Sequence, residues 1–234
     1  MTILDDQISP LLLTSEKKVF GDFIAFTTWE NTTGTPISFF STKWQVPPPP
    51  KAHDNQTIFL FNGLQNEAPP AKRRYILQPV LQWGKSDSGG GNYWSIASFF
   101  AMIDDDKKLL GTSTDPIRVE PGETLTGIIE ITGKSLLNGE NVYHYRCSFQ
   151  GIDGTVLHAN CLKELKWCLE TLEVFKLGEP PRCSDYPNTD SIIFSEITIQ
   201  TNEIKPPIEW QSRGKSECGQ AIVADSGDVL IRFR

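Results

Sequence analysis

Two carboxamides that could take part in chemistry lie in the segment 75–83, Tyr-Ile-Leu-Gln-Pro-Val-Leu-Gln-Trp. Alternate residues of a β-strand point to the same face, so Gln78 and Gln82 would share a face with the apolar Ile76 and Val80. A carboxamide among apolar positions must find hydrogen-bond partners or line a cleft, because burying its polar atoms unpaired is costly. This segment is therefore a candidate binding or catalytic strand.

A carboxylate lies in similar surroundings in the segment 166–173, Lys-Trp-Cys-Leu-Glu-Thr-Leu-Glu. As a strand, this segment places Glu170 on one face with Cys168 and Leu172, where burial would raise the pKa of the carboxyl group. A carboxylate can deprotonate water, and a carboxamide N–H can stabilise an oxyanion. Glu170 and Gln78 together could thus hydrolyse an amide without a metal, with Glu170 working best near its unperturbed pKa of about 4.3.

Two His-x-x-Cys pairs, His144 with Cys147 and His158 with Cys161, superficially resemble a zinc site. Residues three apart on a strand point to opposite faces, so these pairs do not supply the convergent ligands that zinc needs. A nucleophilic Cys–His pair among the same residues stays open. The Asp104–Asp106 run lacks the ligand spacing of a calcium loop, and the Gly–Ser stretch 86–91 lacks a phosphate-binding pattern. We expect no metal and no cofactor.

The composition favours strands and turns, with 13 Phe, 6 Trp, 5 Tyr, 18 Gly and 16 Pro against only 2 Met. We expect an all-β protein with a single domain over residues 23–234, and residues 1–22 as an N-terminal arm that packs on it. The expected strands are 23–29, 37–46, 57–64, 75–83, 92–103, 117–120, 125–132, 141–150, 155–160, 165–177, 191–201 and 221–233. The stretch 162–177 also has helical spacing, so a helix there is the alternative.

The formal net charge of −7 argues against nucleic-acid and anionic-membrane partners, which need a basic face. We find neither a signal-peptide pattern nor an apolar run of membrane-spanning length, and therefore expect a cytoplasmic protein with mostly reduced thiols. The 5 cysteines would leave one thiol over in a fully disulfide-bonded chain. A mature secreted form that carries an added Met would show the same sequence features, so this alternative stays open. The oligomeric state stays open as well.

Between about residues 23 and 201 the chain resembles the glutamic peptidases, or eqolisins. Their catalytic glutamine lies in Ile-Leu-Gln followed closely by Trp, as Gln78 does here with Trp83. Their catalytic glutamate lies in a strand of the type aromatic-x-apolar-Glu-x-apolar-Glu, which segment 167–173 resembles. Further similarities are Trp44-Gln45-Val46-Pro47, Phe61-Asn62-Gly63-Leu64, Trp94 in an aromatic-rich strand, and the Pro121-Gly122 turn.

This resemblance implies a β-sandwich of two curved antiparallel seven-stranded sheets, similar to concanavalin A. It also implies that Glu170 is the general base and then the acid of a peptidase, that Gln78 stabilises the oxyanion, and that Phe61, Tyr93 and Trp94 line a substrate groove. Gln65 and Gln82 stand where the family has aspartates, and we assign them to substrate binding. Two alternatives stay open on the same groove: acid/base chemistry on a small molecule without proteolysis, and a lectin-like module that binds carbohydrate.

Overall fold

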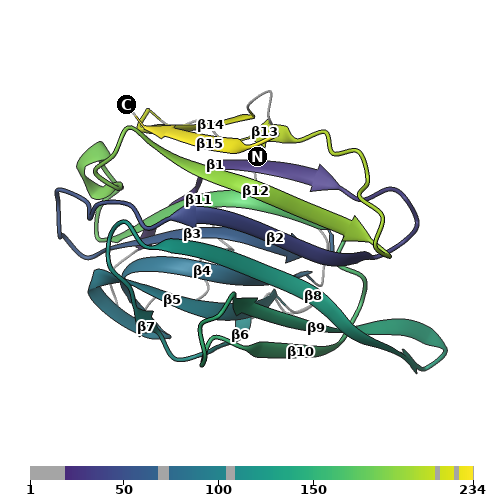
Figure 1. Cartoon of the computed structure of the whole chain (residues 1–234). Helices are drawn as coiled ribbons and strands as arrows, with labels where there is room; N and C mark the ends of the chain where they lie inside the picture. Colours follow the sequence, from purple (N-terminus) through teal and green to yellow (C-terminus); the bar gives the residue numbers. More distant parts are fainter. Residues whose placement is uncertain (1–18, 68–73, 104–108, 214–216, 224–226, 234) are drawn as a thin grey trace.

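The computed structural model describes residues 19–67, 74–103, 109–213, 217–223 and 227–233. Two antiparallel sheets lie face to face, as Figure 1 shows, so the expected all-β sandwich is confirmed. Sheet I has eight strands in the order β13-β1-β11-β3-β4-β5-β6, with β7 beside β5. Sheet II has seven, in the order β10-β9-β8-β2-β12-β15-β14.

The strands of sheet I are β13 (Gln211–Arg213), β1 (Val19–Glu30), β11 (Trp167–Leu177), β3 (Gln56–Gln65), β4 (Arg74–Ser86), β5 (Gly89–Ile103), β6 (Leu109–Ser113) and β7 (Ile117–Arg118). Those of sheet II are β10 (Leu157–Leu162), β9 (Glu140–Phe149), β8 (Thr124–Leu137), β2 (Ile37–Gln45), β12 (Ser191–Thr201), β15 (Val229–Phe233) and β14 (Gly219–Val223). A short 3₁₀ turn, η1 (Cys183–Asp185), follows β11.

The stretch 162–177, for which a strand and a helix were both considered, is not helical. Residue 162 ends β10, and residues 167–177 form β11 in the middle of sheet I, between β1 and β3. The expected last strand, 221–233, is instead the hairpin of β14 and β15, and the short strands β6 and β13 were not expected. The aspartate run 104–106 lies outside the described residues.

The core lies between the sheets. Leu60 of β3, Leu81 of β4 and Leu172 of β11 point from sheet I toward sheet II and are fully buried there. From sheet II, the Trp44 ring packs against Phe194 at a centroid distance of 5.5 Å. Alternate residues on the sheet I strands must therefore point the other way, to the face that we call the outer face of sheet I.

The outer face of sheet I has an apolar cluster of its own: Phe59, Phe61, Val80, Ala97, Phe99 and Phe175. Phe59 of β3 lies opposite Gln82 of β4, which lies opposite Ser95 of β5. Phe99 is four residues beyond Ser95 on β5, and therefore two strands and four residues away from Phe59. On a flat sheet this would separate the two Phe Cα atoms by about 16 Å. The ring centroids of Phe59 and Phe99 are nevertheless 6.1 Å apart, so the side chains converge as they do on the concave side of a curved sheet.

A disulfide joins Cys183 in η1 to Cys218 just before β14, a pairing that was not expected from the sequence. Cys147 and Cys168 are free and buried. Spacing alone could not reveal this pairing, because the two half-cystines are 35 residues apart and meet only when the sheets stack.

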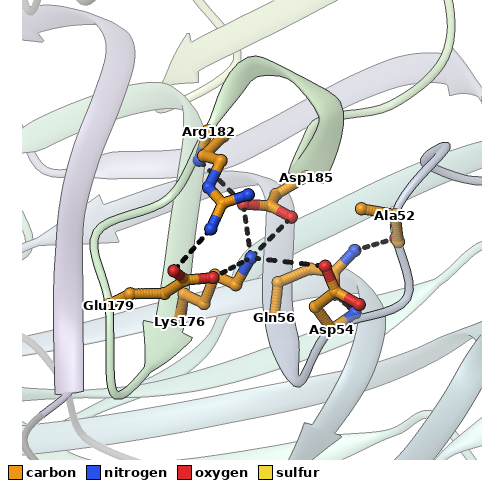
Figure 2. Close-up of polar contacts among 7 residues, drawn as sticks. All are labelled: Ala52, Asp54, Gln56, Lys176, Glu179, Arg182 and Asp185. Atoms are coloured by element: carbon orange, nitrogen blue, oxygen red, sulfur yellow. Dashed lines mark hydrogen bonds and ion pairs between the residues drawn. The ribbon is translucent and has the colours of Figure 1, made fainter.

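The segment carrying η1 is also held by a buried ion cluster at the end of β11 (Figure 2). The Lys176 ammonium contacts both carboxylate oxygens of Asp185 at 3.0 Å, Glu179 at 2.9 Å and Asp54 at 3.7 Å. Arg182 adds an ion pair with Glu179 at 2.6 Å. Burial acts to lower the pKa of Lys176, but its hydrogen bonds to Glu179 and Asp185 outweigh this effect and raise it.

Candidate functional site

Gln78 and Glu170 lie on opposite faces of sheet I. Gln78 is on the outer face, in line with Val80 of the apolar cluster, as the alternation predicted. Glu170 points toward sheet II, where the Thr42 hydroxyl of β2 donates to Glu170 Oε1 at 2.5 Å. Glu170 does share a face with Cys168 and Leu172, but that face is the interior of the sandwich. The structure therefore does not bring this expected pair together around a shared water.

Glu170 is fully buried, and its Oε2 has no hydrogen-bond partner among the described residues. Asn62 lies directly opposite on β3, and its Oδ1 is likewise without a partner in the described part of the chain. Burial raises the pKa of Glu170 well above its ordinary value, and the hydrogen bond from Thr42 only partly opposes this. Burial therefore favours the neutral, protonated form of the Glu170 carboxyl group.

Glu173 is a carboxylate on the outer face of sheet I. In register it lies opposite Phe59, which lies opposite Gln82, so one cross-strand row runs Glu173, Phe59, Gln82 and Ser95. Glu173 is 3% exposed. The row therefore places Glu173 of β11 and Gln82 of β4 on either side of Phe59, on the same face of sheet I.

Sequence reasoning paired Gln78 with Glu170, which lie on opposite faces of sheet I, and did not consider Gln82 with Glu173, which share one. An apolar-Leu-Gln triplet occurs twice in one strand, at 76–78 and at 80–82. The two glutamates of β11 are three residues apart and must face opposite ways on a strand. Strand parity could have signalled that only one glutamate faces a glutamine, but the choice needed the cross-strand register.

The carboxamide of Gln82 is held by the tight turn between β4 and β5. Its Nε2 donates to the carbonyl oxygens of Gly84 and Gly89, both at 2.9 Å, and its Oε1 accepts from Ser86 Oγ at 2.9 Å. A Cβ at Gly90, where φ is +94°, would lie 2.4 Å from Gln82 Nε2, so this position requires glycine. The Gly–Ser stretch thus orients a side chain.

Several other polar atoms on this face are buried and have no hydrogen-bond partner among the described residues. They are Gln78 Oε1, Thr171 Oγ1, Thr28 Oγ1 and Ser95 Oγ. Gln78 itself is 7% exposed. Because a buried polar atom without a partner is costly, these positions are the ones at which a bound molecule could supply hydrogen bonds.

The other expected groove residues divide between the two faces. Phe61 and Gln65 lie on the outer face of sheet I, with Phe61 in the apolar cluster. Trp94 points into the core, where its ring packs against Trp83 at 5.5 Å, so its expected place in the groove is wrong. Its neighbour Tyr93 lies under the Arg118 guanidinium, 5.2 Å from the ring centroid. Adjacent strand residues cannot line one face, which explains the division.

The first His-x-x-Cys pair does not form a site, and the Cys161 side chain of the second pair lies outside the described part of the structure. His144 is at the surface, with Ser135 Oγ at 3.0 Å and Asn160 Oδ1 at 3.1 Å, while Cys147 is buried in the core. Burial raises the pKa of the Cys147 thiol to about 12, so it is not a ready nucleophile. Within the described ranges, no three His, Cys, Asp or Glu side chains gather as metal ligands would. Nor does the described part of the chain contain a helix long and apolar enough to cross a bilayer.

Comparison with known proteins points to one class of fold. No family model matches the sequence, and no curated protein matches it either. Among solved structures, scytalido-glutamic peptidase with a transition-state analog inhibitor superposes with a TM-score of 0.51 at 9% identity, over 93% of this chain and 100% of that one. SCP-B, an eqolisin peptidase in complex with the tripeptide Ala-Ile-His, gives a TM-score of 0.49 at 9% identity, over 92% and 100%.

The chain therefore has the β-sandwich fold of the eqolisin peptidases, as the sequence resemblance implied. A toad ovary galectin in complex with thio-digalactose also matches, with a TM-score of 0.36 at 12% identity over 75% of this chain and 98% of that one. At these identities the comparisons establish the fold, and the activity must be argued from the site.

Proposed function

We propose that the protein is a glutamic-type hydrolase that cleaves an extended polypeptide on the outer face of sheet I. The observation that carries this proposal is the cross-strand row in which Glu173 and Gln82 flank Phe59 on a concave aromatic face. An extended peptide offers apolar side chains to such a floor, and its backbone groups can pair with the unpartnered oxygens of Gln78 and Thr171.

In this proposal Glu173 deprotonates the attacking water and then returns the proton to the leaving amine, so each turnover ends with the carboxylate restored. The Gln82 carboxamide stabilises the tetrahedral oxyanion. Both of its N–H groups donate to turn carbonyls, at Gly84 and Gly89, so substrate binding must replace one of these bonds. The chemistry requires neither a metal nor a covalent intermediate.

The test compares two glutamates of the same strand. Glu173→Gln removes the proposed base from the outer face, while Glu170→Gln, three residues away, alters only the interior. Digestion of casein and denatured globin is measured from pH 2 to pH 8, with circular dichroism as the check on folding. We expect the parent and Glu170→Gln to cleave and Glu173→Gln to lose at least a hundredfold in rate, as removal of a general base typically does.

Two results would overturn the proposal. If the parent cleaves neither protein anywhere in this pH range, hydrolysis of polypeptide is excluded. If folded Glu173→Gln retains full activity and Glu170→Gln loses it, the assignment of the outer face is wrong.

A further inference from the structure

The outer side of sheet II carries a cleft, which we call the sheet II cleft. It lies where β2 ends and where β8 and β12 begin, and its volume is about 800 Å³. Pockets that bind ligands have volumes of roughly 300–1,000 Å³. The residues that line the cleft all belong to the described part of the chain, whereas residues 1–18 of the expected N-terminal arm lie outside it.

The cleft opens because β2 and β12 separate before either strand ends. Their register stops where Lys43 lies opposite Ser195. β2 nevertheless continues to Gln45, paired with β8, and β12 begins as early as Ser191, paired with β15. Since β8 and β15 lie on the far sides of the two strands, the edges of β2 and β12 that face each other there have no strand partner in the described part of the chain.

Two core residues show how deep the cleft is. Trp44 and Ile192 point toward sheet I and belong to a core cluster between the sheets, yet both line the cleft. Residues with this direction can be reached from the outer side of sheet II only where neighbouring strands are not packed together. Trp44 is 1% exposed, and its Nε1 has no hydrogen-bond partner among the described residues. The floor of the cleft is therefore apolar and includes an indole with an unpaired N–H donor.

The backbone of Gln45 faces this cleft from β2. Val46 N donates to Glu123 O, and Val46 O accepts from Gly122 N, so both backbone groups of Val46 point to the β8 side. The backbone N–H and C=O groups of successive strand residues point to opposite edges. Those of Gln45 therefore point toward β12, where the register gives them no partner.

The backbone of Ile193 faces the cleft from β12. Asp190 O accepts from Phe233 N at the end of β15, so Asp190 points to the β15 side. By the same alternation Ile192 points to β15, and Ile193 points to β2. Ile193 and Gln45 thus present N–H and C=O groups to one gap from two sides.

We propose that the sheet II cleft binds a short extended segment of a partner polypeptide, which enters between β2 and β12 and pairs with the backbone of Gln45 and Ile193. An extended chain is the ligand whose own N–H and C=O groups repeat at the spacing of a strand edge. The open part of β12, residues 191–194, has room for about four residues of the bound segment, or about 13 Å.

The lining also indicates the chemistry of the bound segment. Alternate side chains of an extended segment point to opposite sides, so every second one would meet the floor of Trp44 and Ile192 and should be apolar. The cation of the lining, Lys43, already forms an ion pair with Glu196. A paired cation offers little to an anionic small molecule, which favours an uncharged peptide.

This inference does not rest on the proposed function. Glu173 and Gln82 lie on the outer face of sheet I, and the cleft lies on the opposite side of the sandwich. Binding in the cleft and cleavage on sheet I can therefore be measured apart.

The first experiment uses capped pentapeptides of the form Thr-X-Thr-X-Thr, in which X is Ala, Val, Leu or Phe, with residue-resolved NMR on the full chain. With at least one peptide, amide hydrogen exchange at Gln45 and Ile193 should slow at least tenfold. Exchange at Val46 and Ile192, whose amides point to β8 and β15, should change less than twofold. Mass spectrometry of each peptide afterwards scores cleavage separately.

The second experiment removes backbone donors from either partner. A peptide N-methylated at its three central amides keeps its side chains and should bind at least tenfold more weakly. Ile193→Pro removes one N–H at the gap and should weaken binding at least fivefold, while Ile193→Thr, the matched control, should bind as the parent does. Circular dichroism checks folding, and if Ile193→Pro does not fold, the N-methylated peptide decides.

Four results would overturn the proposal. They are no slowing at Gln45 and Ile193 with any of the peptides, equal binding of the N-methylated copy, peptide-induced changes confined to the outer face of sheet I, and the same protection in the absence of peptide at protein concentrations where the chain dimerises. The last result would assign the cleft to a second copy.

Discussion

The buried carboxyl of Glu170 makes the sharpest prediction for stability. Its pKa is raised well above the ordinary value of 4.5 by burial, so the folded protein holds a proton there that the unfolded chain releases. Because the folded state binds more protons, this group makes stability fall as pH rises from about 4.5 toward the raised pKa. Glu170→Gln keeps the shape and a hydrogen-bond donor but removes the titration.

The magnitude follows from linkage. For each pH unit between 4.5 and the raised pKa, the free energy of unfolding of the parent falls by about 1.4 kcal/mol, and the Gln variant does not show this fall. The variant should therefore match the parent near pH 4 and become progressively more stable than the parent above it.

The assay is urea unfolding of both proteins at half-unit steps from pH 4 to pH 8, with Glu67→Gln at an exposed position as the control. Infrared spectroscopy of the folded parent should also show the carbonyl stretch of a protonated carboxyl group that disappears in Glu170→Gln. A stability difference that is flat with pH, or a Gln variant less stable than the parent at pH 7, would show that Glu170 is ionised in the fold and refute this reasoning.

Three further predictions concern stability. Lys176→Met should lower the free energy of unfolding, measured with urea, by about 3–5 kcal/mol because it leaves the buried Asp185 without its cation. Asp54→Asn, on the exposed side of the same cluster, should lower it by less than about 1 kcal/mol. Equal losses for the two variants would contradict the burial argument. Gly127→Ala should lower the free energy of unfolding by about 1–3 kcal/mol, because a Cβ there would lie 2.3 Å from Asn62 Oδ1. Gly133→Ala in the same strand should leave the free energy of unfolding nearly unchanged. Reduction of the disulfide should lower the free energy of unfolding by up to about 4 kcal/mol for its separation of 35 residues, and an unchanged midpoint with dithiothreitol would contradict this.

The disulfide also bears on where the protein works. Stable disulfides are typical of oxidising compartments. We therefore infer that the secreted alternative from the sequence is favoured over the cytoplasmic one. Secretion by the native host, tested with an antibody against culture medium and cell fractions, would decide between them.

Alternation of apolar and polar residues was enough to predict the class of fold and most strands of the two sheets. It also grouped Gln78 with Gln82 and Glu170 with Cys168 correctly, because side-chain direction along one strand is a local property. What alternation cannot give is which face of a strand meets the other sheet, since both faces of β11 are apolar enough to be buried.

The errors in the site follow from that limit. Glu170 and Trp94 were assigned to a groove but face the interior, and Glu173 was passed over although it shares a face with Gln82. The cross-strand register that joins β11, β3 and β4 is set by contacts distant in sequence, so no single segment contains this information.

The strands at the borders of the two sheets have a consequence for behaviour at high concentration. β13, β14, β6 and β10 are 3, 5, 5 and 6 residues long, whereas β4 and β5 inside sheet I have 13 and 15. A short border strand offers few unpaired backbone N–H and C=O groups to a neighbouring molecule. These four border strands therefore offer little template for strand addition by themselves, and the longest open stretch is on β1, which pairs with β13 at only three residues, Phe26 to Thr28.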